Sequence, residues 1–266
     1  VQTQSLVATR VVGGAAEATV IVQYISGIGI AVYTIIRKAE VRSVVKFRNL
    51  KRSRMREIVS FSLLTCVQQS VMSLGILMVQ GVVNSFGTVV MAAFAAAVKI
   101  DAFAYMPVQD FGNAFSTFIA QNYGAKENER IRKGLKSAVC ISMAFCIVVS
   151  ALVCIFAEPL MKLFVEAKET EIIREGVRYL RIEGAFYCGI GCLFLLYGLY
   201  RALGKHAMSV VLTVISLGTR IALSYILSAT PAIGVLGIWW SVPIGWILAD
   251  LTGFYFKFKK DTLLAQ

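Results

Sequence analysis

The stretch KSAVCISMAFCIVVSALVCIFA, residues 136–157, carries no charge after its first residue. A helix needs roughly 20 such residues to cross the hydrocarbon core of a bilayer, and backbone groups in lipid must pair within their own segment. Similar stretches lie on both sides of it, at 11–36, 58–83, 88–119, 176–200, 206–229 and 233–256. The sequence therefore predicts an all-α polytopic membrane protein with seven transmembrane helices.

Basic residues alternate between the connections of these stretches. Of the 27 Lys and Arg residues, 19 lie in four segments: 37–56, 126–136, 201–205 and 257–260. The connections 81–90 and 228–236 carry no charge. The positive-inside rule then predicts a cytoplasmic 37–56 loop and C-terminus, with the N-terminus of this chain outside. The net charge of +12 therefore comes from basic residues in the cytoplasmic loops, and nucleic acid is not an expected partner.

The chain begins with Val1 and has no signal peptide. Because it opens on what looks like the tail of an earlier loop, we expect a fragment whose upstream helices are missing. Residues 37–57 form a basic connector, for which an amphipathic helix on the inner leaflet and a solvated tether are equally good interpretations.

The stretch 88–119 carries two charges near mid-membrane, Lys99 and Asp101. A charge there costs about 2.5–3.5 kcal/mol on insertion scales. Two residues apart on a helix, the side chains point to different sides and favour partners on other helices. Pro107 removes a backbone donor and should kink or break the helix, with Asn113 just beyond it. Ionisable residues beside a kink indicate a functional site, although a structural charge pair is the alternative.

Other stretches hold further polar candidates. Gln68 and Gln69 would either line a cavity or form interhelical hydrogen bonds. Glu183 would be interfacial or face a central cavity. Arg220 lies inside an apolar stretch and should seek a carboxylate, the candidates being Asp101, Glu183 and Asp250. Trp239 and Trp240 are expected at the outer boundary of the last span, as in an aromatic belt.

Metal and enzyme chemistry are not expected. The six cysteines lie inside predicted spans without a CxxC pair, and His206 is the only histidine. Buried apolar packing is the expected role of the cysteines. The sequence contains no HExxH or GxSxG motif, and no cofactor is implied.

Several stretches together resemble the multidrug and toxic compound extrusion (MATE) family. GGAAEATVIVQYIS at 13–26 resembles the start of its sixth helix, and SLLTCVQQSVMSLG at 62–75 its seventh. The run from MAAFAAAVKID to RIRKG at 91–134 resembles the eighth helix and its following loop. LYRALGK at 199–205 resembles the end of the tenth. The order matches helices six to twelve of twelve, most similarly in the DinF-like bacterial branch.

The resemblance implies a two-lobe transporter with a central cavity. Residues 1–36 would be the last helix of the first lobe, 37–57 the connector between lobes, 58–256 the second six-helix lobe and 257–266 a cytoplasmic tail. It implies export of organic cations or drugs across the bacterial cytoplasmic membrane, by alternating access, in exchange for protons or sodium. Expected partners are the cation, the bilayer and the missing N-terminal lobe.

The resemblance also frames the expected site. Asp101 would bind proton or cation with Lys99 modulating its charge. Pro107 would be the hinge. The remaining expected cavity residues are Gln68, Gln69, Tyr105, Asn113, Glu183 and Arg220. Other branches carry a coupling glutamate in the seventh helix, where this sequence has Gln68, Gln69, Ser70 and Met72. The DinF-like branch couples through an aspartate in the first helix, which this chain does not include.

Two other functions compete with cation export. A lipid-linked oligosaccharide flippase of the same superfamily would need a cationic cavity for pyrophosphate, for which Lys99 and Arg220 are the available residues. A seven-helix receptor fits the span count and the outside N-terminus, but the intramembrane lysine lies in the third span rather than the last.

Overall fold

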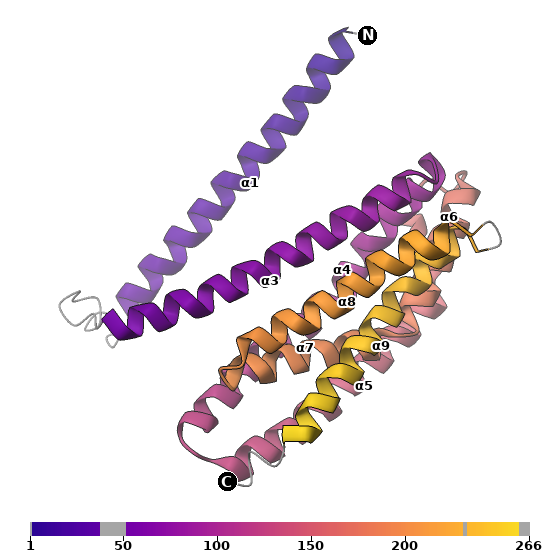
Figure 1. Ribbon diagram of the computed structural model, residues 1–266. Coiled ribbons are helices and arrows are strands. Elements are labelled where there is room, and N and C mark those ends of the chain that lie inside the picture. Colours follow the sequence, from indigo (N-terminus) through magenta and orange to yellow (C-terminus); the bar gives the residue numbers. More distant parts are fainter. Residues whose placement is uncertain (1, 38–51, 231–232, 261–266) are drawn as a thin grey trace. The chain divides into compact units, whose positions relative to one another are not determined.

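The computed structural model describes residues 2–37, 52–230 and 233–260, and the regular elements in these ranges are α-helices (Figure 1). The chain order is α1 (Gln2–Arg37), α3 (Arg52–Asn84), α4 (Thr88–Gly124), α5 (Asn128–Lys162), α6 (Thr170–Gly184), α7 (Tyr187–Ala202), α8 (His206–Ser228) and α9 (Val235–Lys260). This all-helical architecture confirms the fold class that was expected from the sequence.

The chain divides into two compact units, Val1–Val59 and Ser60–Gln266. In the first unit, the described side chains of α1 are exposed except for the half-buried Thr34. Most of the predicted basic connector, residues 38–51, lies outside the described residues, and Arg52 already belongs to α3. The choice between an amphipathic helix and a tether therefore stays open.

The second unit is a helical bundle organised around α4. This helix packs against α5, α6 and α7, while α8 packs along α9 and both contact α7 (Figure 1). The last turns of α3 join the core through Val79 and Val83, which are buried with Phe94 of α4 and Trp239 of α9. Because α4 touches so many elements, its polar side chains can reach partners from several helices.

Helices α4 and α7 run in the same direction, and two of their contacts join residues that are 86 positions apart. Tyr187 hydrogen-bonds to Asp101 at one end of the contact. Three turns further on, Gly198 faces Gly112, and a Cβ added to Gly198 would lie 2.6 Å from the Gly112 carbonyl oxygen. Small residues allow such close approach between membrane helices. This crossing fixes the register that aligns Asp101 with Tyr187.

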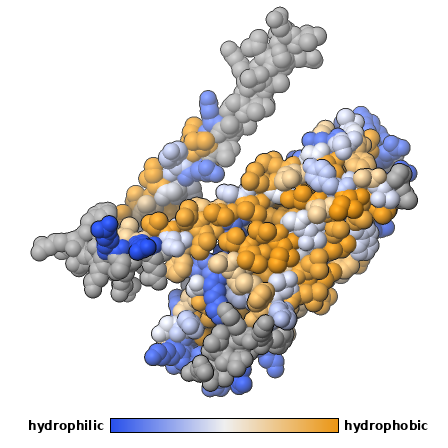
Figure 2. Space-filling model, in the orientation of Figure 1, coloured by the Kyte–Doolittle hydropathy of each residue, from blue (hydrophilic) through white to orange (hydrophobic). Residues whose placement is uncertain are grey.

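Six described helices are long and apolar enough to cross a membrane, and α6 with α7 makes a seventh span if that pair, bent by 52°, is counted as one. Apolar side chains cover much of the surface that Figure 2 displays. The exposed apolar side chains of α5 include Ile147, Val148, Leu152 and Ile155, each at least half exposed. Such a surface suits contact with lipid.

Three possible interruptions of the helices have different outcomes in the structure. The predicted continuous span 176–200 is interrupted between α6 and α7, where Phe186 has φ −112° and ψ 16°. Helix α4 continues through Pro107 from Thr88 to Gly124, so the proline ends no helix. In α5 the chain departs from helical geometry at Phe156, three residues before Pro159, and the helix then extends to Lys162. Proline disturbs the turn that precedes it, which explains the position of this kink.

Two side-chain expectations were also wrong. Trp239 is 1% exposed and packs in the core, so only Trp240 fits an interfacial belt. Of the six free cysteines, Cys66 and Cys140 are exposed on helix surfaces rather than buried. Among the residues that the structure describes, no three His, Cys, Asp or Glu side chains gather into a possible metal site.

Candidate functional site: a buried carboxyl pair beside an aromatic wall

Two acidic side chains from different helices meet inside the second unit. Asp101 of α4 and Glu183 of α6 are each 5% exposed. Both line a cavity of about 150 Å³ whose walls come from α3, α4, α6, α7, α8 and α9. Buried carboxyl groups are rare unless they are paired or functional. The pair is therefore the chemical centre of this cavity.

Tyrosine hydroxyls surround the carboxyl pair. Tyr187 Oη donates to Asp101 Oδ1, and Tyr179 interacts with both acids. The two carboxyl groups also act electrostatically on each other. Asp101 Oδ2 and Glu183 Oε2 are nevertheless buried without a donor from any described side chain or backbone group.

This arrangement has a direct consequence for protons. Carboxylate oxygens only accept hydrogen bonds, so two carboxyl groups can share one only when one of them carries a proton. Two bare negative charges side by side in a low-dielectric site would repel each other strongly. A proton or a cation bound between the two carboxyl groups would relieve this repulsion.

An aromatic wall lies next to the pair. Phe94 and Tyr179, which line the cavity, meet edge-on with ring centroids 5.5 Å apart, and Trp239, which is not part of the lining, packs against both rings. Across the cavity lining, Tyr105 stacks on Phe194 at 6.5 Å. Aromatic faces bind apolar groups and also attract cations. The cavity therefore combines negative charge with surfaces suited to an organic cation.

Arg220 is the one basic side chain in the described lining of this cavity. It acts electrostatically on Asp101 and Glu183, yet among the described residues it forms no ion pair within 4.0 Å, and its Nε is buried without a partner. Of the three carboxylates expected beside Arg220, Asp101 and Glu183 share its cavity, whereas Asp250 does not line it. Asp250 is 8% exposed on α9.

The two glutamines that were expected in the cavity lie in different environments. Gln68 is buried and its Nε2 donates to Thr213 Oγ1 at 3.0 Å, and Thr213 lines the cavity. Gln68 therefore links α3 to α8 just behind the cavity wall. Gln69 is exposed on the surface of α3. The helical rotation of about 100° per residue accounts for the difference.

Three further candidates lie away from the carboxyl pair. Lys99 is exposed on α4, so the expected modulation of Asp101 by Lys99 has no contact to support it. Asn113 is exposed too, and its Oδ1 accepts from Arg201 Nη2 at 2.8 Å. Pro107 borders a separate small cavity between α4 and α5, within an uninterrupted helix.

The partners Tyr179 and Tyr187 were not among the residues predicted for the site. The sequence did carry a signal: Tyr179, Glu183 and Tyr187 are spaced by four residues and form one stripe around the acid. The bend after Gly184 preserves this alignment across α6 and α7.

Comparison with known proteins agrees with this architecture. The family model described as MatE matches residues 65–226. The probable multidrug resistance protein NorM of Thermotoga maritima is 24% identical over 229 residues, covering 86% of this chain and 49% of that protein. The probable multidrug resistance protein YoeA of Bacillus subtilis is 24% identical over 262 residues, covering 95% of this chain and 56% of that protein.

A solved structure shows the same fold. The crystal structure of a MATE protein in the bent conformation superposes with a TM-score of 0.75 at 21% identity, covering 83% of this chain and 49% of that one. The chain thus spans about half the length of the relatives that it matches. Because the MatE model matches more than half of its residues, the chain belongs to the MatE family.

Proposed function

We propose that the protein exports organic cations or drugs as a secondary antiporter, with the Asp101–Glu183 pair as its proton site. The observation that carries the proposal is the pair's position in a cavity with an aromatic wall. The multidrug resistance names of the relatives support export rather than enzymatic chemistry.

In the proposed cycle, proton and substrate compete for one site. A cationic substrate entering from the cytoplasm would lie against the aromatic wall and displace the proton held between Asp101 and Glu183. The two lobes would then rock by alternating access and expose the site to the outside. A proton returning to the pair would release the substrate, because one carboxyl charge is neutralised. Net exchange follows because both ligands need the same negative charge.

The composition of the cavity favours a cation over a lipid-linked pyrophosphate. Its lining includes two carboxyl groups and Arg220, while Lys99 lies outside it. A pyrophosphate would bring further negative charge beside a buried acidic pair, which is electrostatically unfavourable. The flippase is therefore the weaker proposal.

The charge pattern also supports an orientation in the bacterial cytoplasmic membrane. The basic segments 126–136 and 257–260 would face the cytoplasm, as would the connector 37–57. The N-terminus of this chain would then lie outside, and the companion lobe would close the other side of the cavity.

The test is export of a cationic dye from cells that carry the full-length gene, with the proton gradient intact and then collapsed by an uncoupler. We expect export to stop on collapse while a sodium gradient is maintained. Export that persists with only a sodium gradient would mean that sodium, and not the proton, is the coupling ion. Cells that retain dye equally in both states would contradict cation antiport.

A further inference from the structure

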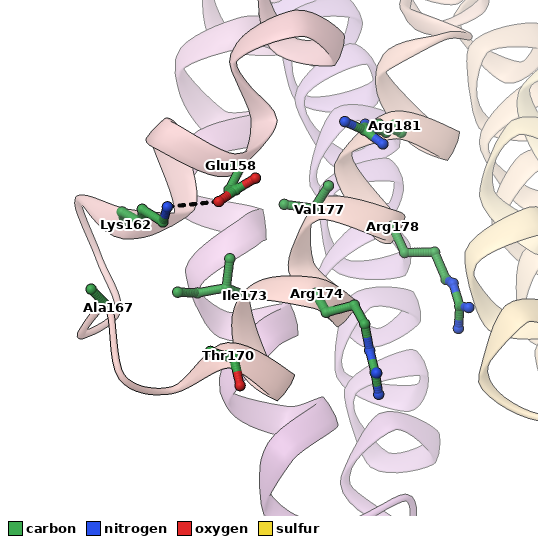
Figure 3. Close-up of a pocket in the computed structure, with 9 residues that line it drawn as sticks. All are labelled: Glu158, Lys162, Ala167, Thr170, Ile173, Arg174, Val177, Arg178 and Arg181. Carbon is green, nitrogen blue, oxygen red and sulfur yellow. Dashed lines mark hydrogen bonds and ion pairs between the residues drawn. The ribbon is translucent and has the colours of Figure 1, made fainter.

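A second cavity, of about 500 Å³, lies between the end of α5 and helix α6, and it shares no lining residue with the cavity of the carboxyl pair. Figure 3 shows Glu158 and Lys162 on α5, with Arg174, Arg178 and Arg181 projecting from successive turns of α6. Its lining carries four basic side chains against one acidic side chain. The proposed transport cycle does not use this cavity.

The ion pairs at this cavity leave part of the positive charge free. Lys162 Nζ bonds to Glu158 Oε1 at 2.6 Å, and Arg178 Nη1 to Glu175 Oε1 at 3.0 Å. Arg174 and Arg181 have no ion pair with any side chain in the described part of the chain. Guanidinium groups bind phosphate and carboxylate oxygens in a two-pronged geometry. The cavity is therefore suited to an anion.

Exposed apolar side chains in the turn that follows α5 suit an anion that is part of a lipid. Ile173, 6% exposed, and the half-buried Val177 lie among the cavity residues (Figure 3). In the turn that leaves α5, Leu163 is 76% exposed and Phe164 43% exposed. Exposed apolar residues at a helix end are placed well at the depth of lipid headgroups, where arginines meet phosphates.

The charge pattern makes these arginines unusual. The alternation of basic loops predicts that residues 158–175 lie outside the membrane, where the positive-inside rule disfavours Lys and Arg. Acidic residues match the basic ones along 158–181, five of each, but Arg174 and Arg181 have no ion pair within 4.0 Å in the described part of the chain. A soluble anion would satisfy the charge, but it would not use Leu163, Phe164 or the apolar flank of α5.

We propose that this cavity binds the phosphate of an anionic phospholipid. The headgroup phosphate would lie beside Arg174 and Arg178, and the acyl chains would run over Leu163 and Phe164 onto the exposed apolar side of α5. Such a lipid would brace the α5–α6 turn, the element that leads directly into Glu183. The site would thus couple membrane composition to the helix that carries half of the proton pair.

The test is lipid retention by purified full-length protein, measured by native mass spectrometry from detergent micelles doped with phosphatidylglycerol or with phosphatidylcholine. We expect the wild type to retain phosphatidylglycerol preferentially. Arg174→Gln with Arg178→Gln should weaken that retention about tenfold or more, since each basic residue near an anionic surface contributes about 1 kcal/mol and 1.4 kcal/mol is a factor of ten. The paired substitutions Arg174→Lys and Arg178→Lys keep the charge and should lose less.

Lys133→Gln is the matched control, because Lys133 is an exposed, ion-paired cation at the other end of α5. Its phosphatidylglycerol retention should equal that of the wild type. A third arm adds inorganic phosphate to the phosphatidylglycerol micelles: displacement of the lipid at millimolar phosphate would overturn the lipid assignment in favour of a free anion. Unchanged retention in both Arg174/Arg178 double variants would overturn the site altogether. The measurement needs no transport, so it is independent of cation export.

Discussion

Asp101→Asn should abolish dye export while leaving the protein in the membrane at its normal level. Asparagine keeps the size of the side chain and can still accept the hydrogen bond from Tyr187. It cannot carry the negative charge for which proton and substrate compete. A unit charge about 4 Å away contributes about 4 kcal/mol at an effective dielectric constant of about 20. Its loss corresponds to more than a hundredfold in cation affinity.

The matched control is Lys99→Gln, which removes a charge two residues away on the exposed side of the same helix. Export by this variant should stay close to that of the wild type. Membrane levels of both variants are compared by immunoblot, and export by the rate of dye loss. Normal export by Asp101→Asn at normal protein level would remove Asp101 from the mechanism.

Gly198→Ala, which adds one methyl group to α7, should destabilise the bundle. The added Cβ would lie 2.6 Å from the carbonyl oxygen of Gly112, which is backbone and cannot rotate away. Helices α4 and α7 would have to separate, at a cost of about 1–3 kcal/mol for overpacking. Separation would also pull Tyr187 from Asp101. We expect a lower Tm of the purified protein together with weaker export.

Gly218→Ala makes the same change where no atom lies within 4 Å of the new Cβ. Alanine is the better helix former by about 1 kcal/mol, so this variant should be as stable as the wild type or more so. Equal Tm values for Gly198→Ala and Gly218→Ala would show that the α4–α7 crossing is not closely packed.

Much of the fold could be predicted from the sequence because lipid imposes a simple rule on it. A segment such as 136–157 has to be a helix to satisfy its backbone, and it lies within α5. The bend between α6 and α7 could not be predicted, since neither proline nor charge marks Ala185 and Phe186. At Pro107, where a kink or a break was expected, α4 continues without a break.

The two acidic residues of the site could be predicted from the sequence, but their arrangement in space could not. Asp101 and Glu183 each stand out as an acid in an apolar span, yet nothing in the sequence says that α4 and α6 bring them together. Lys99 was expected to modulate the charge of Asp101 although the two side chains point to different sides of the helix, and Lys99 is in fact exposed. The actual partners come from 82 and 86 residues away, through contacts that only the folded bundle defines.

The most direct test of the proposed exchange is proton release on substrate binding, followed with a pH indicator in weakly buffered solution of the purified full-length protein. Adding a cationic substrate to the wild type should release protons in proportion to the substrate bound. Asp101→Asn and Glu183→Gln should release few or none. Saturating binding by the wild type without proton release, in sodium-free buffer, would contradict the claim that proton and cation compete for this carboxyl pair.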